Sequence, residues 1–348
     1  MRVNIALKKS VDSSYDVQIA TLEKKVYDTK VAIITNPKVS GLHLSYLLDR
    51  IEAKEVYVVT VSDGEEFKNL ATVENILSDL FNHRLDRKSL LIAFGGGVIG
   101  DMTGFTASIY QRGIDFIQVP TTLLSMVDAS VGGKTGINNR YGKNLIGAFY
   151  QPKAVYIDSH FLTTLGNREY AAGIAEIIKM AVTFDKDFFT FLEQASLHEK
   201  KDVEEAIRRS VEIKANVVVL DEKENGIRAA LNYGHTFAHV IENESGYGTL
   251  LHGEAVAIGM VMANRLAVLL GLMTEQEEKR VEQLLQKYDL PTNYTILDVA
   301  KFYDTFFLDK KSAQGKISFI LPKGLGDVEI KDDISSENIK SILEEFGV

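Results

Sequence analysis

The sequence predicts an α/β protein in two parts, with a parallel β-sheet in the first half and a mainly α-helical second half. Short β-branched segments alternate with helical segments up to about residue 159, which is typical of a parallel sheet with helical crossovers. Beyond residue 160 long helical segments dominate. A chain of 348 residues also exceeds what one hydrophobic core usually supports. We therefore expect domains at residues 1–159 and 160–348, with a ligand site in the cleft between them.

The individual elements follow from the hydrophobic pattern. Five short, apolar, β-branched segments are predicted strands: residues 30–36, 55–61, 89–97, 115–120 and 154–158. Segments 40–51 and 70–85 have helical periodicity and supply crossovers. In the second half we predict helices at 171–184, 202–220 and 275–288, a helix that starts at Arg228, and a late strand at 316–322.

Composition excludes several classes of protein. A hydrophobic content of 45% with 25% charged residues is typical of a globular protein. The net charge of −9, without a long Lys/Arg block, argues against nonspecific nucleic-acid binding. The absence of cysteine excludes disulfides and thiolate chemistry and agrees with a reducing cytoplasm, where we expect the protein to act. The apolar segment 255–273 contains Asn264 and Arg265, so we predict a buried helix there and no membrane span.

The segment from Arg228 to Glu254 is the most informative in the chain. Arg228, Asn232, His235 and His239 are spaced by four, three and four residues, which places them on one face of a continuous helix. A cation, an amide and two imidazoles cannot form an ordinary apolar core. We therefore expect this face to look into an anion- and metal-binding cleft.

A metal site is predicted from two histidines and one buried acid. Catalytic zinc usually has three protein ligands and one open position. His235 and His252 are candidates, and Glu176 lies in a small, apolar helical segment where an unpaired carboxylate would be costly. The alternative is that Lys179, one turn later, pairs with Glu176; the clustered histidines favour the metal. HTFAH is not the HExxH motif of zinc proteases, and the spacing leaves His239 open as a core or a substrate residue.

Two glycine-rich segments indicate phosphate binding. Gly95–Gly97 end a predicted strand and precede a helix, an arrangement in which backbone N–H groups can approach a phosphate, although GxGxxG is absent. Residues 128–144 combine four glycines with Lys134, Lys143 and Asn144, which favours an anion-binding loop. A carboxylate in the GEEFK segment at residue 64 could bind ribose hydroxyls. If they converge, the cations of both halves would suit a substrate with a phosphate and a carboxylate: Arg112, Lys134, Lys143, Lys179, Lys214, Arg228, Lys310 and Lys311.

Eight motifs in order resemble the 3-dehydroquinate synthase family. They span residues 64 to 322 as GEEFK, GGGVIGD, QVPTTLLSMVDASVGGKTGIN, YGKNLIGAF, AAGIAEIIK, DEKENGIRAALNYGHTFAHVIE, LHGEAVAIGM and LDKKSAQGKISFILP. The first ~60 and last ~25 residues carry little of the resemblance. The departures are small: Arg140 stands where relatives often have proline, and Met180 where an aromatic residue or histidine is common.

The resemblance implies a fold and an activity. The family has an N-terminal Rossmann-like domain and a mainly helical C-terminal domain, usually as a homodimer, and uses NAD and one divalent metal, zinc or cobalt. It converts 3-deoxy-D-arabino-heptulosonate 7-phosphate to 3-dehydroquinate and phosphate, a step of the shikimate pathway to aromatic amino acids. The reaction combines transient oxidation by NAD, β-elimination of phosphate, re-reduction and intramolecular aldol closure.

The resemblance also assigns site residues. The implied metal ligands are Glu176, His235 and His252. The implied NAD contacts are Glu65, Lys68, Gly95, Gly96, Gly97, Val98, Asp101, Thr121, Thr122, Lys134 and Lys143. Arg228 would hold the substrate carboxylate, and Arg112 would reach the neighbouring subunit's site. The phosphate would be surrounded by Lys134, Asn144, Lys179, Asn232, His239 and Lys311, and the ring hydroxyls and carboxylate end by Asp128, Lys214 and Glu224.

Three other functions remain open from the sequence. A different sugar-phosphate cyclase, such as a 2-deoxy-scyllo-inosose or valiolone synthase, would share the NAD and metal apparatus but would not need Arg228 and Lys214 for a carboxylate. A metal-dependent polyol dehydrogenase would release NADH and would need fewer phosphate-directed cations. A catalytically silent binding protein need not keep the metal ligands and Lys134.

Overall fold

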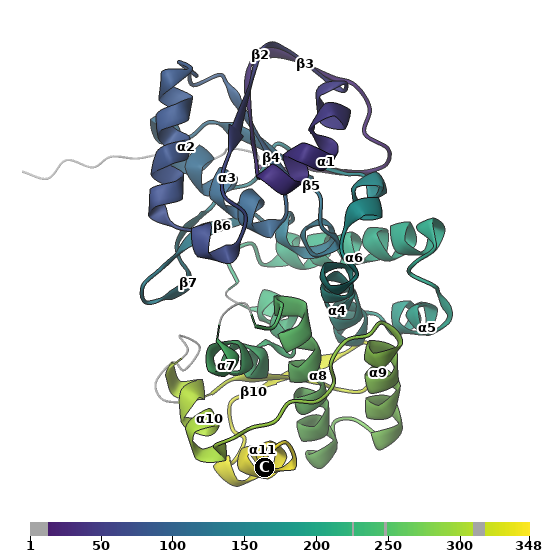
Figure 1. The fold of residues 1–348 in the computed structure, drawn as a ribbon. Helices are drawn as coiled ribbons and strands as arrows, with labels where there is room; N and C mark the ends of the chain where they lie inside the picture. Colours follow the sequence, from purple (N-terminus) through teal and green to yellow (C-terminus); the bar gives the residue numbers. More distant parts are fainter. Residues whose placement is uncertain (1–12, 225, 247–248, 309–316) are drawn as a thin grey trace, which may run out of the picture.

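The computed structural model describes residues 13–224, 226–246, 249–308 and 317–348. Figure 1 shows a half built on a sheet and a half built mainly of helices. The long helices α4 (Asn167–Phe184) and α6 (Lys200–Leu220) lie where these halves meet. The predicted fold class, a parallel-sheet half followed by a mainly helical half, is confirmed.

The large sheet has six parallel strands in the order β1-β8-β5-β4-β2-β3. All five predicted strands are present, and the edge strand β1 was not predicted. Strands β2 and β3 begin earlier than predicted because their first residues form a half-exposed ribbon outside the central sheet. The bounds are β1 Asp16–Ile19, β2 Lys25–Thr35, β3 Ile51–Thr60, β4 Leu90–Gly95, β5 Asp115–Pro120 and β8 Ala154–Ile157.

Helices cover both faces of this sheet. Along β2, Val31 and Ile33 belong to one hydrophobic core, and Ala32 and Ile34 belong to the other. This alternation of buried side chains requires apolar residues at every position, which is why the central strands are continuous hydrophobic runs. The crossovers are α1 (Pro37–Leu48), α2 (Leu70–Asn82) and α3 (Gly97–Ile109).

The glycine-rich turn lies at the topological switch point of the sheet. The chain runs from β2 outward to β3 and then returns to the other side of β2 with β4. In doubly wound folds, ligands bind at the carboxyl ends of the strands beside such a reversal. Gly95 ends β4 and Gly97 begins α3, so the turn between them lies at that edge.

The prediction that residues 128–144 form a loop is wrong. This segment contains the end of a π-helical turn, η3 (Ser125–Ala129), and an antiparallel hairpin of β6 (Lys134–Asn139) and β7 (Gly142–Phe149). Gly147 faces Gly136, and a Cβ on Gly147 would lie 2.1 Å from the Thr135 carbonyl oxygen. The glycines therefore permit close strand pairing, a use that composition alone does not distinguish from loop flexibility.

The second half is helical as predicted. Its helices are α4, α5 (Lys186–Gln194), α6, α7 (His235–Ser245), α8 (His252–Leu269), α9 (Glu275–Lys287), α10 (Val299–Thr305) and α11 (Ser336–Glu345), with the hairpin β9 (Phe319–Pro322) and β10 (Val328–Lys331). The short 3₁₀ segments of the chain are Glu65–Phe67, Tyr110–Arg112, Ser159–Thr164, Ile227–Asn232 and Phe306–Leu308. Helix α8 is buried along almost its whole length. Among the described residues, no helix is both long and apolar enough to cross a membrane. Strand β9 confirms part of the predicted strand 316–322, and Lys316 lies outside the described residues.

The predicted continuous helix from Arg228 to His239 is wrong. A 3₁₀ segment ends at Asn232, Gly234 adopts a left-handed conformation with φ of 80°, and α7 starts at His235. The cause is the close crossing of α8, because a Cβ on Gly259 would lie 2.1 Å from the Gly234 carbonyl oxygen. The break places His235 at the first turn of its own helix.

Candidate active site

Three helices bring one acid and two histidines together. Glu176 lies in the middle of α4, His235 begins α7 and His252 begins α8. One ligand atom from each residue lies within 4.8 Å of the other two. The Nε2 atoms of His235 and His252 lie 3.8 and 3.7 Å from Glu176 Oε1. Groups separated by up to 76 positions along the chain therefore form one compact cluster of possible metal ligands.

Neighbouring groups turn Nε2 of both imidazoles toward Glu176. His235 Nδ1 lies 3.2 Å from the Tyr233 carbonyl oxygen, and His252 Nδ1 lies 3.5 Å from Glu242 Oε1. With a proton on Nδ1, each ring donates to that acceptor and turns the lone pair of Nε2 toward Glu176. The start of α8 is fixed by Glu254, which accepts from the Leu251 backbone N–H at 2.7 Å.

Glu176 fits a metal ion better than an ordinary core position. Its side chain is buried, and neither carboxylate oxygen makes a regular hydrogen bond with the described residues. Lys179 forms an ion pair with Oε2, so the predicted alternative partner is present, while Oε1 faces the two imidazoles. A buried carboxylate oxygen and two nitrogen lone pairs repel one another unless a cation lies between them. One oxygen and two nitrogen donors are a common protein ligand set for zinc.

Opposite charges surround this cluster. Burial lowers the pKa of Lys179, but Glu176 and Asp128 outweigh burial and raise it. Burial raises the pKa of Asp128, but Lys214 and Lys179 hold it far below its ordinary value. Burial lowers the pKa of Lys214, and Asp128 offsets only part of this effect. The site therefore gathers cations and carboxylates out of bulk solvent, where their interactions are strong.

Three of the cations that the sequence singled out make contacts near the cluster, and these contacts join both halves of the chain. Lys134 on β6 pairs with Glu224, whose other oxygen accepts from Asn232 Nδ2 at 2.7 Å. Lys214 on α6 lies 2.7 Å from Asp128 Oδ1. The buried Arg228 donates to the Gly132 carbonyl oxygen at 3.0 Å and also to the Glu222 carbonyl oxygen.

Further residues predicted for the substrate are His239, Arg112 and two lysines of the segment 309–316. The His239 ring contacts His235, with 5.8 Å between the ring centroids. Arg112 ends the 3₁₀ segment after α3, and within the described parts of the chain no hydrogen bond or ion pair joins it to the cluster. Lys310 and Lys311 fall outside the described residues.

A second polar group lies beside the glycine-rich turn. Lys68 is 4% exposed, and its Nζ lies 2.6 Å from both Asp101 Oδ2 and Asn144 Oδ1. Burial lowers the pKa of Lys68, but Asp101 and Glu65 raise it overall. Asn144, predicted to lie with the phosphate ligands, is therefore held against a predicted NAD residue. Glu65 accepts from Asn138 Nδ2 at 2.8 Å.

The two predicted threonines follow β5. Thr122 Oγ1 lies 2.9 Å from Ser125 Oγ, whereas the buried Oγ1 of Thr121 makes no hydrogen bond with the described residues. Thr121 also donates its backbone N–H to the Gly95 carbonyl oxygen at 2.9 Å. Both residues therefore adjoin the glycine-rich turn at the end of β4.

Sequence reasoning missed Glu242. It is 7% exposed on α7, where its Oε1 lies 3.1 Å from Lys143 Nζ and 3.5 Å from His252 Nδ1. Against the effect of burial, His252 and Lys143 lower the pKa of Glu242 to about 2. A signal was available, because Glu242 follows His235 by seven residues and therefore shares its helix face.

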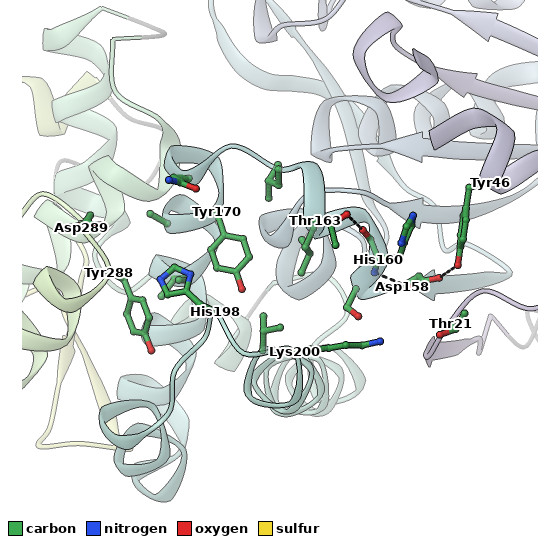
Figure 2. Close-up of a pocket in the computed structure, with 17 residues that line it drawn as sticks. Thr21, Tyr46, Asp158, His160, Thr163, Tyr170, His198, Lys200, Tyr288 and Asp289 are labelled. Carbon is green, nitrogen blue, oxygen red and sulfur yellow. Dashed lines mark hydrogen bonds between the residues drawn. The ribbon is translucent and has the colours of Figure 1, made fainter. Parts of the chain in front are cut away.

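A separate cavity of about 520 Å³ lies between the 3₁₀ segment Ser159–Thr164, α4 and the start of α6. Figure 2 shows Tyr46 alongside His160, with the Tyr46 hydroxyl directed at Asp158. Asp158 also accepts from the backbone N–H groups of Leu22 and His160. The Asp158 carboxylate therefore joins three chain segments by hydrogen bonds. None of the three possible metal ligands lines this cavity.

Comparison with known proteins identifies the family. The sequence profile of the 3-dehydroquinate synthase N-terminal domain matches residues 58–172, and the profile of the C-terminal domain matches residues 173–312. The chain belongs to the 3-dehydroquinate synthase family. The two profiles meet inside α4, whereas the sequence placed the domain boundary at residue 159.

A curated 3-dehydroquinate synthase from Sulfurimonas denitrificans is 64% identical over 347 residues, covering 100% of this chain and 99% of the relative. Among solved structures, the 2-epi-5-epi-valiolone synthase of Streptomyces hygroscopicus, with NAD⁺ and Zn²⁺ bound, is 28% identical with a TM-score of 0.86 and covers 99% of each chain. A 2-deoxy-scyllo-inosose synthase in complex with carbaglucose-6-phosphate, NAD⁺ and Co²⁺ is 26% identical with a TM-score of 0.82, covering 92% of this chain and 91% of its own.

Proposed function

We propose that this chain is a 3-dehydroquinate synthase, a lyase that converts 3-deoxy-D-arabino-heptulosonate 7-phosphate to 3-dehydroquinate and phosphate. The observation that carries this proposal is the convergence of Glu176, His235 and His252 beside cations from both halves of the chain. Relatives such as the 64%-identical enzyme of Sulfurimonas denitrificans support the substrate assignment. The enzyme takes part in the shikimate pathway and so in aromatic amino-acid biosynthesis.

The residues present fit the two cofactors. When bound, NAD supplies a hydride acceptor that later returns the hydride, and the divalent ion, zinc or cobalt, supplies a Lewis acid. Glu176, His235 and His252 would hold the ion. NAD would lie along the turn at Gly95–Val98 and Asp101, with Glu65 and Lys68 toward its ribose and Thr121 and Thr122 toward the nicotinamide half.

The cations would bind the two anionic ends of the substrate. Glu224 places a carboxylate between Lys134 and Asn232, so an anionic oxygen already fits at the position assigned to the substrate phosphate. Lys179, Asn144, His239 and Lys311 would complete the phosphate site. Arg228 would bind the substrate carboxylate, with Lys214 and Asp128 beside the carboxylate end and the ring hydroxyls.

This arrangement supports elimination without a dedicated general base. Phosphate leaves as its C–O bond breaks, and the proton on the neighbouring carbon is transferred to a phosphate oxygen. Lys134 and Lys179 stabilise the charge that develops on the leaving group, and the remaining residues orient the substrate. The protein would therefore act chiefly by orienting the substrate and by stabilising the charge on the leaving phosphate.

A phosphate-release assay tests the proposed function. With the heptulosonate phosphate as substrate, we expect stoichiometric phosphate and 3-dehydroquinate, catalytic rather than stoichiometric use of NAD, and loss of activity with a chelator that zinc or cobalt restores. A matched assay with a sugar phosphate that lacks a carboxylate should give much slower release. Steady accumulation of NADH without phosphate release would instead identify a polyol dehydrogenase.

Another sugar-phosphate cyclase activity is the second candidate. Valiolone and scyllo-inosose synthases share the fold at 28% and 26% identity. The buried guanidinium of Arg228 and the ammonium of Lys214 favour a substrate with a carboxylate over these alternatives. Faster turnover of a sugar phosphate that lacks a carboxylate would instead favour one of these other cyclases.

The oligomeric state and the cellular location follow from the same family assignment. The chain would act in the cytoplasm as a homodimer on a small-molecule substrate, without nucleic acid or membrane partners. Arg112, which ends the 3₁₀ segment after α3, would reach the phosphate site of the neighbouring subunit, as the resemblance to the family implies.

A further inference from the structure

Glu242 joins the metal cluster to the hairpin of the sheet half. Its side chain is buried on α7, and one oxygen, Oε1, lies 3.5 Å from His252 Nδ1 and 3.1 Å from Lys143 Nζ. Lys143 is the second residue of β7, and His252 is the first residue of α8. A single carboxylate oxygen therefore contacts residues that are far apart along the chain and belong to different halves of the molecule.

The two candidate histidine ligands differ in the charge of the group that faces Nδ1. Both candidate histidine ligands lie at the start of a helix, where the helix dipole disfavours a cation. An acceptor on Nδ1 fixes the tautomer that leaves Nε2 available and makes the imidazole a stronger ligand. For His235 a backbone carbonyl serves as the acceptor, whereas for His252 the acceptor is an anion. Glu242 thus adds negative charge on the side of the cluster remote from Glu176.

Lys143 stabilises Glu242 in this role. A buried carboxylate without a cation is costly, and the ammonium group at 3.1 Å offsets that cost. The contact also ties the hairpin β6–β7 to α7. The same hairpin carries Lys134 at its first residue, so its position decides where a phosphate-directed cation lies.

We propose that Glu242 is a positioning residue that orients His252 for metal binding and, through the same oxygen, anchors the β6–β7 hairpin to the helical half. The proposal rests on the proposed function only in that Glu176, His235 and His252 bind a divalent ion. Glu242 itself does not touch the substrate or the ion. Its effect is exerted through His252 on one side and through Lys143 on the other.

Metal affinity tests whether Glu242 supports metal binding through His252. Zinc is titrated calorimetrically into the metal-stripped full chain, where wild type binds one ion per chain. We expect Glu242→Gln to weaken binding by about 10- to 100-fold, the usual effect of losing an outer-sphere partner. The matched control is Glu244→Gln, two residues along the same helix and so on another face, which should bind zinc like wild type. Wild-type affinity in Glu242→Gln would overturn the proposal.

The cobalt spectrum separates orientation from simple loss of charge. In the cobalt-loaded chain, a turned His252 changes the ligand geometry, so the visible absorption bands of Glu242→Leu, which has no acceptor for the Nδ1 proton, should shift relative to wild type and Glu242→Gln, whose amide oxygen still accepts. Unchanged bands would show that Glu242 acts only through its charge and would contradict a positioning role. If Glu242→Leu does not fold, Glu242→Asp keeps the charge on a shorter side chain that no longer reaches Nδ1, and it should show the same spectral shift.

Hydrogen exchange tests whether Glu242 anchors the β6–β7 hairpin through Lys143. Both Glu242→Gln and Lys143→Met should speed amide exchange in Lys134–Phe149, and Lys143→Met should weaken zinc binding much less than Glu242→Gln. Unaltered hairpin exchange in both variants would refute the anchoring role. Failure of the wild-type chain to bind zinc would refute the proposed metal site itself, and so the two failures are distinguishable.

Discussion

Glu176→Gln is expected to remove the metal and reduce phosphate release to background. Glutamine has the same shape, but a neutral amide is a poor ligand, and the two imidazoles alone do not complete a catalytic zinc site. Because loss of an outer-sphere partner already weakens metal binding by about 10- to 100-fold, loss of this direct ligand should exceed that range. Metal analysis of the purified variant and the phosphate-release assay measure both effects.

The same substitution should also lower stability. Lys179 would lose its buried partner, and breaking a buried ion pair typically costs about 3–5 kcal/mol in the free energy of unfolding. Urea denaturation of the metal-free proteins measures this cost. The control is Glu169→Gln in the first turn of the same helix, where the side chain is 44% exposed and the effect should be small. Retention of one ion per chain in Glu176→Gln would contradict the assigned ligand role.

Lys134→Ala is expected to slow elimination by about 100- to 1000-fold, with a much smaller loss of NAD affinity. The ammonium group lies where the leaving phosphate is assigned, and loss of one donor that stabilises developing charge typically lowers kcat by about 100- to 1000-fold. Its side chain is 49% exposed, so the pair with Glu224 contributes little to stability. Phosphate release and an NAD titration followed by protein fluorescence separate the two properties.

Lys153→Ala provides a matched control for Lys134→Ala. Lys153 is also exposed, pairs with Asp115 and lies close to the hairpin in sequence, but it has no place in the proposed site. We expect wild-type turnover from this variant. Wild-type turnover from Lys134→Ala as well would rule out the role assigned to Lys134 in elimination.

The sequence predicted the elements whose burial has a simple period. Strands β2, β3, β4, β5 and β8 each contain an apolar run, so these five segments were found, although β3 lies at an edge of the sheet. The half-exposed edge strand β1 and the glycine-containing hairpin β6–β7 have no such run and were missed. The break at Gly234 was missed because it depends on Gly259 of another helix, and a single glycine within a helical pattern does not reveal such a crossing.

The cluster of possible metal ligands could be predicted because each of its three residues is unusual in its segment of the sequence. Glu176 stands in an apolar helix, and His235 and His252 stand in a segment unusually rich in histidine. The sequence around Glu242 is not unusual, because an acidic residue on a helix usually faces solvent. The pairing of Lys134 with Glu224 and of Lys143 with Glu242 joins residues 90 and 99 positions apart, which periodicity and motif spacing do not report.

Anomalous scattering at the zinc edge from crystals grown with NAD and Zn²⁺ tests the central claim most directly. The account predicts one strong peak coordinated by Glu176, His235 Nε2 and His252 Nε2 at about 2.0–2.2 Å, facing the nicotinamide ring. A zinc peak elsewhere, or three side chains turned away from one another with no ion between them, would contradict it.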